Sequence, residues 1–222
     1  MNNSVTNTAR LLGAGLRALL VLTLVTGVIY PLVITGIAQG LFPGKANGSQ
    51  IKAEGKVVGS SLIGQSYNLP LKKGQETPEP DLKWFQGRPA NGLGTNSVNT
   101  QYKLLLSGAT NLSADNKELV KQVEAAKAAV VEDNSVPGYE VSPSQVPADA
   151  VTSSASGLDP DISPQYADLQ AHRVAEKNGL PVAEVHKLVD EHTKGRALGF
   201  MGEPRVNVLE LNIALKKLVA KS

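Results

Sequence analysis

Residues 18–38 read ALLVLTLVTGVIYPLVITGIA, and this stretch decides the architecture of the chain. It contains no charged residue, and at about 1.5 Å rise per residue it spans about 30 Å, the thickness of the hydrocarbon core of a bilayer. A cleaved signal peptide would have a shorter apolar region, of about 7 to 15 residues, although Gly36-Ile37-Ala38 could serve as a cleavage site. We therefore expect one uncleaved transmembrane helix at residues 16–42, after a cytoplasmic N-terminus of residues 1–15.

Three residues of the span are candidates for contacts with other membrane helices. Pro31 removes a backbone donor, and membranes tolerate such a break where neighbouring helices satisfy the freed groups. Gly27 lies four residues after Thr23, and Gly36 lies four residues before Gly40, so each pair shares a helix face where another backbone could approach. Small residues are also common in membrane spans generally, and that simpler interpretation stays open for either pair.

The charges that flank the span do not decide its orientation. Arg10 and Arg17 precede it, but Lys45, Lys52 and Lys56 follow it closely. A long following domain is translocated largely regardless of such charges. The arrangement is that of a signal-anchor, which predicts a cytoplasmic N-terminus and an extracytoplasmic domain of residues 43–222.

The composition of the chain excludes several classes of protein. The 222 residues carry 22 Lys and Arg against 20 Asp and Glu, a net charge of +2. That balance does not provide the basic face that a nucleic-acid-binding protein needs. With no cysteine, disulfide bonds, thiolate zinc sites and a cysteine nucleophile are excluded.

The domain after the anchor is predicted to be α+β, with short strands early and helices late. Phe42-Pro43-Gly44 should end the membrane helix, and Trp84-Phe85 should anchor a core. The expected strands and loops follow in chain order: hairpin strands at 56–58 and 62–63, a surface loop at 69–80, and a long loop at 133–164 with one strand near 150–153.

Four helices are predicted from apolar spacing and end signals. They cover residues 113–131 with Ser113 as N-cap, residues 164–177 behind Ser163 and ended by Asn178-Gly179, residues 181–195, and a last helix from Asn207, where Glu210 completes a capping box.

The residue clusters that could form a catalytic or metal site are weak candidates. Ser154, Ser156 and Asp159 lie in SASGLDPDIS, but the glycine that precedes a hydrolase serine is missing, and a tight turn uses the same residues. His186 and Asp190 are spaced to share a helix face near His192, yet no third metal ligand accompanies them, so a solvated polar face is the simpler interpretation.

Two further short motifs do not indicate a binding site. Residues 40–46, GLFPGKA, lack the spacing and the hydroxyl residue of a phosphate-binding loop. Gly87-Arg88-Pro89 is expected to form a turn, with Arg88 stacked on an aromatic ring.

In order along the chain, these segments resemble the C-subunit family of the bacterial Kdp potassium-transporting ATPase. The resemblance covers nearly the whole chain, departs from the family in loops such as residues 69–80 and 93–106, and rests on the following motifs: Tyr30-Pro31-Leu32, ANGS at 46–49, GSSLIGQ at 59–65, WFQGRP at 84–89, SGATNL at 107–112, VTSSASGLDP at 151–160, Arg173-Val174-Ala175 and GEPRVNVLELNIAL at 202–215.

The resemblance implies a non-catalytic, single-pass subunit of a complex in the bacterial plasma (inner) membrane that takes up potassium with high affinity. Its partners would be a channel-like potassium-translocating subunit, a P-type ATPase subunit, a small stabilising membrane peptide and membrane lipid. It would have no cofactor of its own, because the complex handles ATP and potassium, and it would raise the ATP affinity of the ATPase subunit.

Under this interpretation the partner-contact candidates are Gly27, Pro31, Gly36, Ser154, Ser156, Gly157 and Asp159. We expect a role in assembly and ion access rather than direct contact with ATP. Two alternatives of other classes stay open: a membrane-tethered extracytoplasmic hydrolase, and a stand-alone binding protein.

Overall fold

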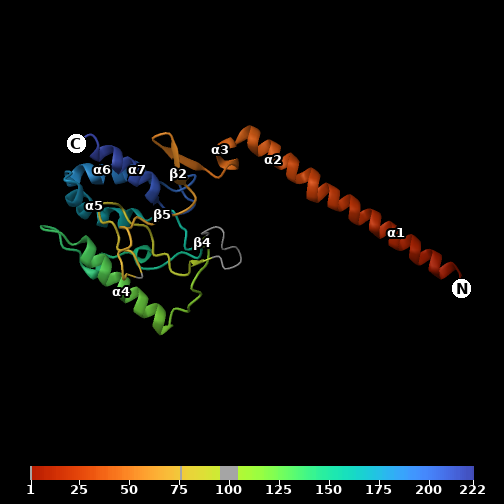
Figure 1. Cartoon of the computed structure of the whole chain (residues 1–222), viewed down its shortest axis with the longest axis horizontal. Coiled ribbons are helices and arrows are strands. Elements are labelled where there is room, and N and C mark those ends of the chain that lie inside the picture. Colours follow the sequence, from red (N-terminus) through yellow and green to blue (C-terminus); the bar gives the residue numbers. More distant parts are fainter. Residues whose placement is uncertain (1, 76, 96–104) are drawn as a thin grey trace. The chain divides into compact units, whose positions relative to one another are not determined.

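The computed structural model describes residues 2–75, 77–95 and 105–222, and it consists of two compact units, Met1–Gln50 and Ile51–Ser222 (Figure 1). The first unit is helical and the second combines helices with small sheets. The predicted α+β domain with one N-terminal transmembrane helix is therefore confirmed.

Most of the first unit is one continuous helix made of α1 (Asn2–Leu24), the π-helical turn η1 (Val25–Ile29) and α2 (Tyr30–Leu41). Among the described residues, Ser4–Leu41 is the one helix long and apolar enough to cross a membrane, with 38 residues. At about 1.5 Å per residue it is about 57 Å long, so it exceeds the hydrocarbon core of a bilayer by several turns. The helix thus begins before the charge-free stretch, and the exact limits of the membrane-embedded part stay a prediction.

The π-helical turn lies directly before Pro31. Proline has no backbone N–H, and in a regular α-helix its ring crowds the carbonyl one turn earlier. In η1 the Tyr30 amide donates to the Val25 carbonyl, five residues back, which widens the turn. Thr26 Oγ1 donates to the Leu22 carbonyl at 2.7 Å and gives that oxygen a side-chain donor. The helix therefore continues through Pro31, with a local change of hydrogen bonding in place of a break.

The membrane helix ends at Phe42 as predicted. Phe42 leaves the helical region with φ −136°, and a single turn, α3 (Pro43–Ala46), follows. The side-chain amides of Gln39 and Asn47 then bond to each other, with 3.0 Å between Asn47 Nδ2 and Gln39 Oε1. After this corner only the short segment 47–50 leads into the second unit.

The described part of the second unit forms three small sheets. One pairs β1 (Gln50–Ala53) with β2 (Lys56–Ser60), a second pairs β3 (Gly94–Thr95) with β4 (Leu105–Leu106), and a third has the order β5-β7-β6, formed by Asp161–Ile162, Arg205–Asn207 and Thr193–Lys194. In the third sheet both pairings are antiparallel.

The first hairpin differs from the predicted one. Residues 56–58 are extended as expected, but they pair with the preceding strand β1 and not with residues 62–63, which form a turn. The reason is the two-residue connection, in which Glu54 and Gly55 both have positive φ, 52° and 77°. Positive φ at both central residues is the geometry of the tight hairpin turn that matches strand twist.

The helices of the second unit are α4 (Lys117–Asn134), α5 (Pro164–Asn178), α6 (Val182–His192) and α7 (Val208–Val219), with 3-10 turns η2 (Pro143–Gln145) and η3 (Ala148–Ala150). Two predicted helix starts are confirmed. Ser163 Oγ accepts the Tyr166 amide at 3.1 Å, and Asn207 Oδ1 accepts the Glu210 amide at 3.1 Å. Gly179 ends α5 in the left-handed conformation, as predicted.

Three other details of the predicted elements were wrong: the start of α4, a strand near residues 150–153 and the end of α6. The N-cap of α4 is Asn116 and not Ser113, because the Ser113 hydroxyl is bonded to the Asp115 carboxylate at 2.6 Å. The strand expected near residues 150–153 is a turn, in which Thr152 Oγ1 donates to the Ala148 carbonyl at 2.7 Å.

The helix expected over residues 181–195 ends at His192. The next two residues leave the helix to pair with β7, so a tertiary contact shortens the element.

The core of the second unit lies where α5, α6, α7 and β7 meet (Figure 1). Phe85, from the irregular segment before these helices, is fully buried with them, as predicted. The buried apolar side chains of α5, α6 and α7 are Tyr166, Ala167, Leu169, Ala171, Val174, Ala175, Val185, Leu188, Val189, Val208, Leu209, Leu211 and Leu215. Leu218, also on α7, is only partly buried.

A buried arginine lies in the middle of this core. Arg173 is 1% exposed, and its Nε donates to Asn134 Oδ1 at 2.8 Å. Its two terminal nitrogens donate to the carbonyls of Leu82 and Trp84 and to Gln170 Oε1. Burial lowers the pKa of Arg173 to about 10, so the side chain is still a cation at neutral pH.

Two buried amides complete the same arrangement. Asn212 accepts the Phe85 amide at 2.9 Å and donates to the Phe85 carbonyl at 2.9 Å. In the same way, Gln170 accepts the Gln86 amide at 2.7 Å and donates to the Gln86 carbonyl at 3.1 Å. Side chains of α5 and α7 thus give the irregular segment 82–86 the hydrogen bonds that a neighbouring strand would otherwise supply.

We predict that Arg173→Met lowers the free energy of unfolding of the second unit by about 3 kcal/mol or more, because several buried acceptors lose their donor at about 1 to 3 kcal/mol each. Urea unfolding followed by the fluorescence of Trp84, the only tryptophan, measures it. The control is Arg196→Met, whose exposed ion pair should contribute less than about 1 kcal/mol. Equal stability of the two variants would contradict a structural role for the buried cation.

Candidate functional site

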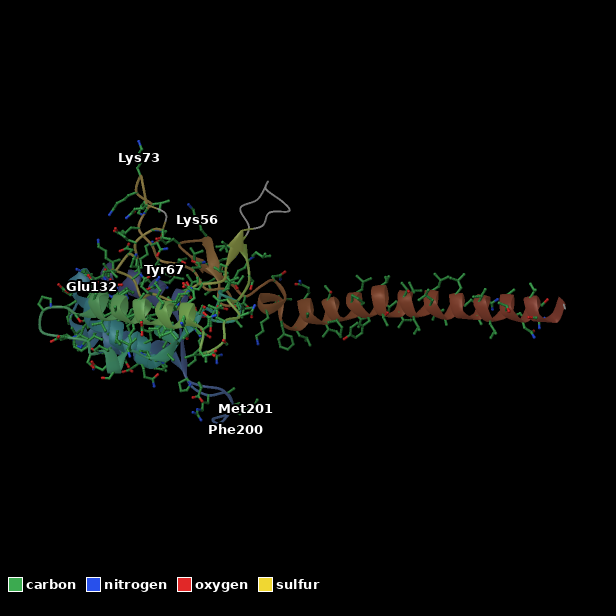
Figure 2. All side chains as sticks on the ribbon, turned by 90° about the horizontal axis from the view of Figure 1, so that it is seen from below. Lys56, Tyr67, Lys73, Glu132, Phe200 and Met201 are labelled. Atoms are coloured by element: carbon green, nitrogen blue, oxygen red, sulfur yellow. The ribbon has the colours of Figure 1, made fainter. Side chains whose placement is uncertain are left out.

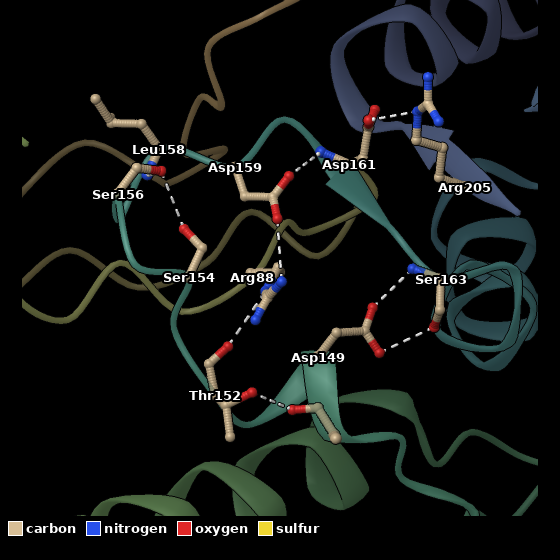
Figure 3. Close-up of polar contacts among 11 residues, drawn as sticks. Arg88, Asp149, Thr152, Ser154, Ser156, Leu158, Asp159, Asp161, Ser163 and Arg205 are labelled. Carbon is tan, nitrogen blue, oxygen red and sulfur yellow. Dashed lines mark hydrogen bonds and ion pairs between the residues drawn. The ribbon is translucent and has the colours of Figure 1, made fainter. Parts of the chain in front are cut away.

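The predicted site residues of the soluble unit lie in one loop between η3 and β5 (Figure 3). Ser154 Oγ and Ser156 Oγ are 3.2 Å apart, and the Ser156 hydroxyl accepts the Leu158 amide at 3.0 Å. These contacts are those of a tight turn stabilised by serine side chains. The structure therefore brings Ser154 and Ser156 together, but as turn residues.

Neighbouring segments hold the backbone of this loop from two sides. The Ser156 carbonyl accepts both the Ser107 hydroxyl, at 2.8 Å, and the Gly108 amide, at 3.2 Å. The Leu158 carbonyl accepts the Gly64 amide at 2.8 Å. Segments that are far apart in the sequence thus meet at the loop, and each contributes a backbone or hydroxyl donor.

Glycines permit this close approach. A Cβ on Gly64 would lie 2.5 Å from the Asp159 carbonyl oxygen. Gly157 has φ +66°, and a Cβ there would lie 2.8 Å from Leu93 Cδ2. The backbone conformation and the packing of the loop itself therefore favour glycine at position 157, a predicted contact residue.

Arg88 links the two ends of the loop, as Figure 3 shows. Its Nη1 is 3.0 Å from Asp159 Oδ2, with the two side chains 24% and 31% exposed, and its Nε donates to the Thr152 carbonyl at 3.4 Å. The expected stacking of Arg88 on an aromatic ring was wrong: the guanidinium pairs with Asp159 instead. The two partners are 71 positions apart in the sequence, which explains why the sequence alone did not indicate the pair.

The other carboxylates of the loop region are engaged in the same structural way. Asp149 accepts both the amide and the hydroxyl of Ser163, at 2.7 and 2.9 Å, and so joins the loop to the start of α5. Asp161 Oδ2 is 2.9 Å from Arg205 Nε, although partial burial raises the pKa of Asp161. The sequence analysis missed Asp149, Asp161 and Arg205. Asp149 and Asp161 lie near the serines in the sequence, but Arg205 is 49 residues after Ser156 and no local signal indicated it.

The histidines make their contacts away from these serines. His186 Nδ1 is 3.1 Å from Asp168 Oδ1 on α5, so its partner is not Asp190, with which a shared metal-binding face had been considered. His172 stacks on Tyr139, with ring centroids 3.7 Å apart, and lies edge-on to His186. Partial burial, followed by the charge of His186, lowers the pKa of His172. Among the described residues no group of three histidine or acidic side chains could hold a metal ion.

The membrane candidates Gly27, Pro31 and Gly36 lie on a helix whose side chains are not covered by other described parts of the chain. A Cβ on Gly36 would meet nothing within 4 Å, and one on Gly27 would meet only Thr23 Cγ2, at 4.0 Å. The contact at Gly27 confirms that Thr23 and Gly27 adjoin on the helix. Neither glycine is needed for packing within the helix, so both are free to admit a neighbour.

Comparison with known proteins places this chain in a family. The family model described as "KdpC: K+-transporting ATPase, c chain" matches residues 12–217. A potassium-transporting ATPase KdpC subunit of Streptomyces avermitilis is 80% identical over 222 residues, covering 100% of both chains. Another, from Gemmatimonas aurantiaca, is 46% identical over 211 residues, which are 93% of this chain and 94% of that one.

We predict that Gly157→Ala costs about 2 kcal/mol or more of unfolding free energy, because a left-handed backbone penalty of about 1 to 2 kcal/mol adds to the clash with Leu93. The matched control is Gly179→Ala, which has the same φ of +66° and nothing within 4 Å of the added Cβ. Urea unfolding curves of both variants isolate the clash. A cost for Gly157→Ala no larger than that of the control would show that the contact with Leu93 relaxes freely.

Proposed function

The chain belongs to the KdpC family, the c chains of K+-transporting ATPases, and from that membership we propose that it is a non-catalytic subunit that stabilises assembly of the complex and assists ion access. Its membership makes it a subunit of a potassium-transporting ATPase complex. The finer role is inferred from how its residues are used.

The observation that carries the proposal is the use of polar groups in the loop of Ser154 and Asp159. A nucleophilic serine needs a neighbouring base, and a general acid or base needs a carboxylate or imidazole that can reach substrate. Here the two serines bond within the loop, and Asp159 is held by Arg88. This arrangement supports a structural or partner-contact role over the alternative of a tethered hydrolase.

The partners proposed for the subunit are a channel-like potassium-translocating subunit, a P-type ATPase subunit and a small stabilising membrane peptide. Potassium and ATP would be bound by these partners, with no cofactor held by this chain. The uncovered faces at Gly27 and Gly36 would admit a partner helix, and their lack of internal contacts supports that assignment.

A rise in the ATP affinity of the ATPase subunit would be transmitted through the membrane helix. With the N-terminus in the cytoplasm and the soluble unit outside, the soluble unit and the nucleotide would lie on opposite sides of the bilayer. The effect would then be a coupling free energy between distant sites, carried by helix contacts and not by direct binding.

The proposed orientation predicts that Lys73→Cys, in the exposed loop at residues 69–80, reacts with a membrane-impermeant maleimide added to intact cells. The chain has no native cysteine, so the label reports this position alone. The matched control is Asn7→Cys, near the opposite end of the membrane helix, which should react only after the cells are broken. The reverse pattern would place the soluble unit in the cytoplasm and allow it to contact ATP directly.

The proposed helix interface predicts that Gly27→Leu with Gly36→Leu reduces recovery of the ATPase and channel-like subunits on a tagged chain purified in mild detergent. Lost packing in lipid is not offset by hydrophobic gain, and even about 1 to 2 kcal/mol per contact weakens association. Gly13→Leu with Gly15→Leu is the control, since both positions are equally open but lie before the charge-free stretch. Unchanged recovery with the first pair would mean that assembly depends on the soluble unit.

A further inference from the structure

The connection between β6 and β7 carries large apolar side chains that the described chain leaves mostly exposed. Leu198 is 83% exposed, Phe200 71% and Met201 52%. We call these three residues the apolar tip. Figure 2 shows Phe200 and Met201 extending away from the body of the second unit, on the side opposite to Lys73.

The tip is an ordered turn. The Ala197 amide donates to the Met201 carbonyl at 2.8 Å, and the Met201 amide returns a bond to the Ala197 carbonyl at 2.9 Å. The Gly199 amide also donates to the Arg196 carbonyl at 3.1 Å. Several backbone donors of the turn are thus satisfied within it, which is what apolar surroundings demand of a backbone.

The conformation of Leu198 is costly for its residue type. Its φ is +54°, in the left-handed region that residues other than glycine rarely occupy, and Gly199 follows with φ +82°. The turn therefore holds a leucine in a strained conformation while its side chain points into solvent. Burial of the Leu198 side chain in an apolar environment would offset the cost of this strained conformation.

Cations flank the tip on both strands. Residues 193–205 contain Lys194, Arg196 and Arg205 against one acid, Glu203. Arg196 Nη2 pairs with Glu203 Oε2 at 2.7 Å across the hairpin. Lys194 and Arg205 pair at the base of the hairpin with Glu210 and Asp161, and their side chains are 50% and 51% exposed.

We propose that the apolar tip inserts into the surface of the lipid bilayer, with Leu198, Phe200 and Met201 at the level of the upper acyl chains and the flanking cations among the lipid phosphates. Apolar and aromatic side chains beside Lys and Arg are the composition of segments that lie in the membrane interface. A cation with an exposed face can contact a phosphate while keeping its carboxylate partner.

The choice of lipid over a protein partner rests on chain connectivity. The second unit is joined to the membrane helix through residues 47–50, a segment that extends at most about 14 Å at about 3.5 Å per residue. The unit cannot leave the neighbourhood of the bilayer, so even weak insertion of three side chains is favoured by the high effective concentration of lipid. The tip would then be a second attachment that restricts rotation of the unit about this short linker.

The test introduces a tryptophan at the tip of the full-length chain, reconstituted alone in vesicles of phosphatidylcholine and phosphatidylglycerol. Phe200→Trp should emit at shorter wavelength than an exposed tryptophan, and lipids brominated near the top of the acyl chain should quench it. Leu71→Trp, at a site 57% exposed in the wild type, is the matched control and should not be quenched. Emission of Trp84 in the unmodified chain gives the background to subtract, and adding Leu198→Ser to Phe200→Trp should reduce the quenching.

Quenching of Phe200→Trp no greater than that of Leu71→Trp would overturn the proposal. A second result would also overturn the proposal: no quenching with the chain alone, and a blue shift that develops only when the partner subunits are present. The tip would then dock on protein. Should Phe200→Trp disturb folding, as judged by its urea unfolding curve, Met201→Trp tests the same position with the same expected outcomes. Since the chain is reconstituted alone, the result does not depend on the proposed role in assembly or on the orientation.

Discussion

The soluble unit depends on side chains that act as a substitute for a neighbouring strand. The segment 82–86 crosses the helical core without regular structure, yet its buried backbone groups must be paired, because an unpaired one costs as much as a lost hydrogen bond. Asn212 and Gln170 pair with Phe85 and Gln86 in both directions, and Arg173 donates to the carbonyls before them. Because these amides come from α5 and α7, the same bonds set where both helices lie against Phe85.

A consequence of this construction is that much of the polar chemistry of the unit is directed inward. Arg88 and Asp159 hold a loop closed, Asp149 fixes the start of α5, and the serines of the loop stabilise a turn. Two of the surfaces that the described chain leaves exposed are apolar: the open glycine faces of the membrane helix and the tip formed by Leu198, Phe200 and Met201. A subunit whose role is association rather than catalysis is expected to expose surfaces of this kind.

Local signals predicted some elements well and others poorly, for identifiable reasons. The helix starts at Ser163 and Asn207 were found because a cap needs only a side chain and an amide three residues later. The start of α4 was misplaced because Ser113 bonds to Asp115 and leaves the cap to Asn116. The end of α6 was also missed, since the pairing of Thr193 with Val206 joins residues 13 positions apart and outweighs helix propensity.

The sequence by itself determined the membrane helix and the α+β character of the domain, because charge-free length and apolar period are properties of neighbouring residues. It also placed Ser154, Ser156, Gly157 and Asp159 in one turn. Only the tertiary structure decided how that turn is held, because it brings Arg88 to Asp159 and Leu93 to Gly157 across more than 60 residues. Likewise, only the fold could reveal that Arg173 is buried and that Phe200 is not. Burial and long-range pairing are properties of the packed chain, and no local pattern of residues encodes them.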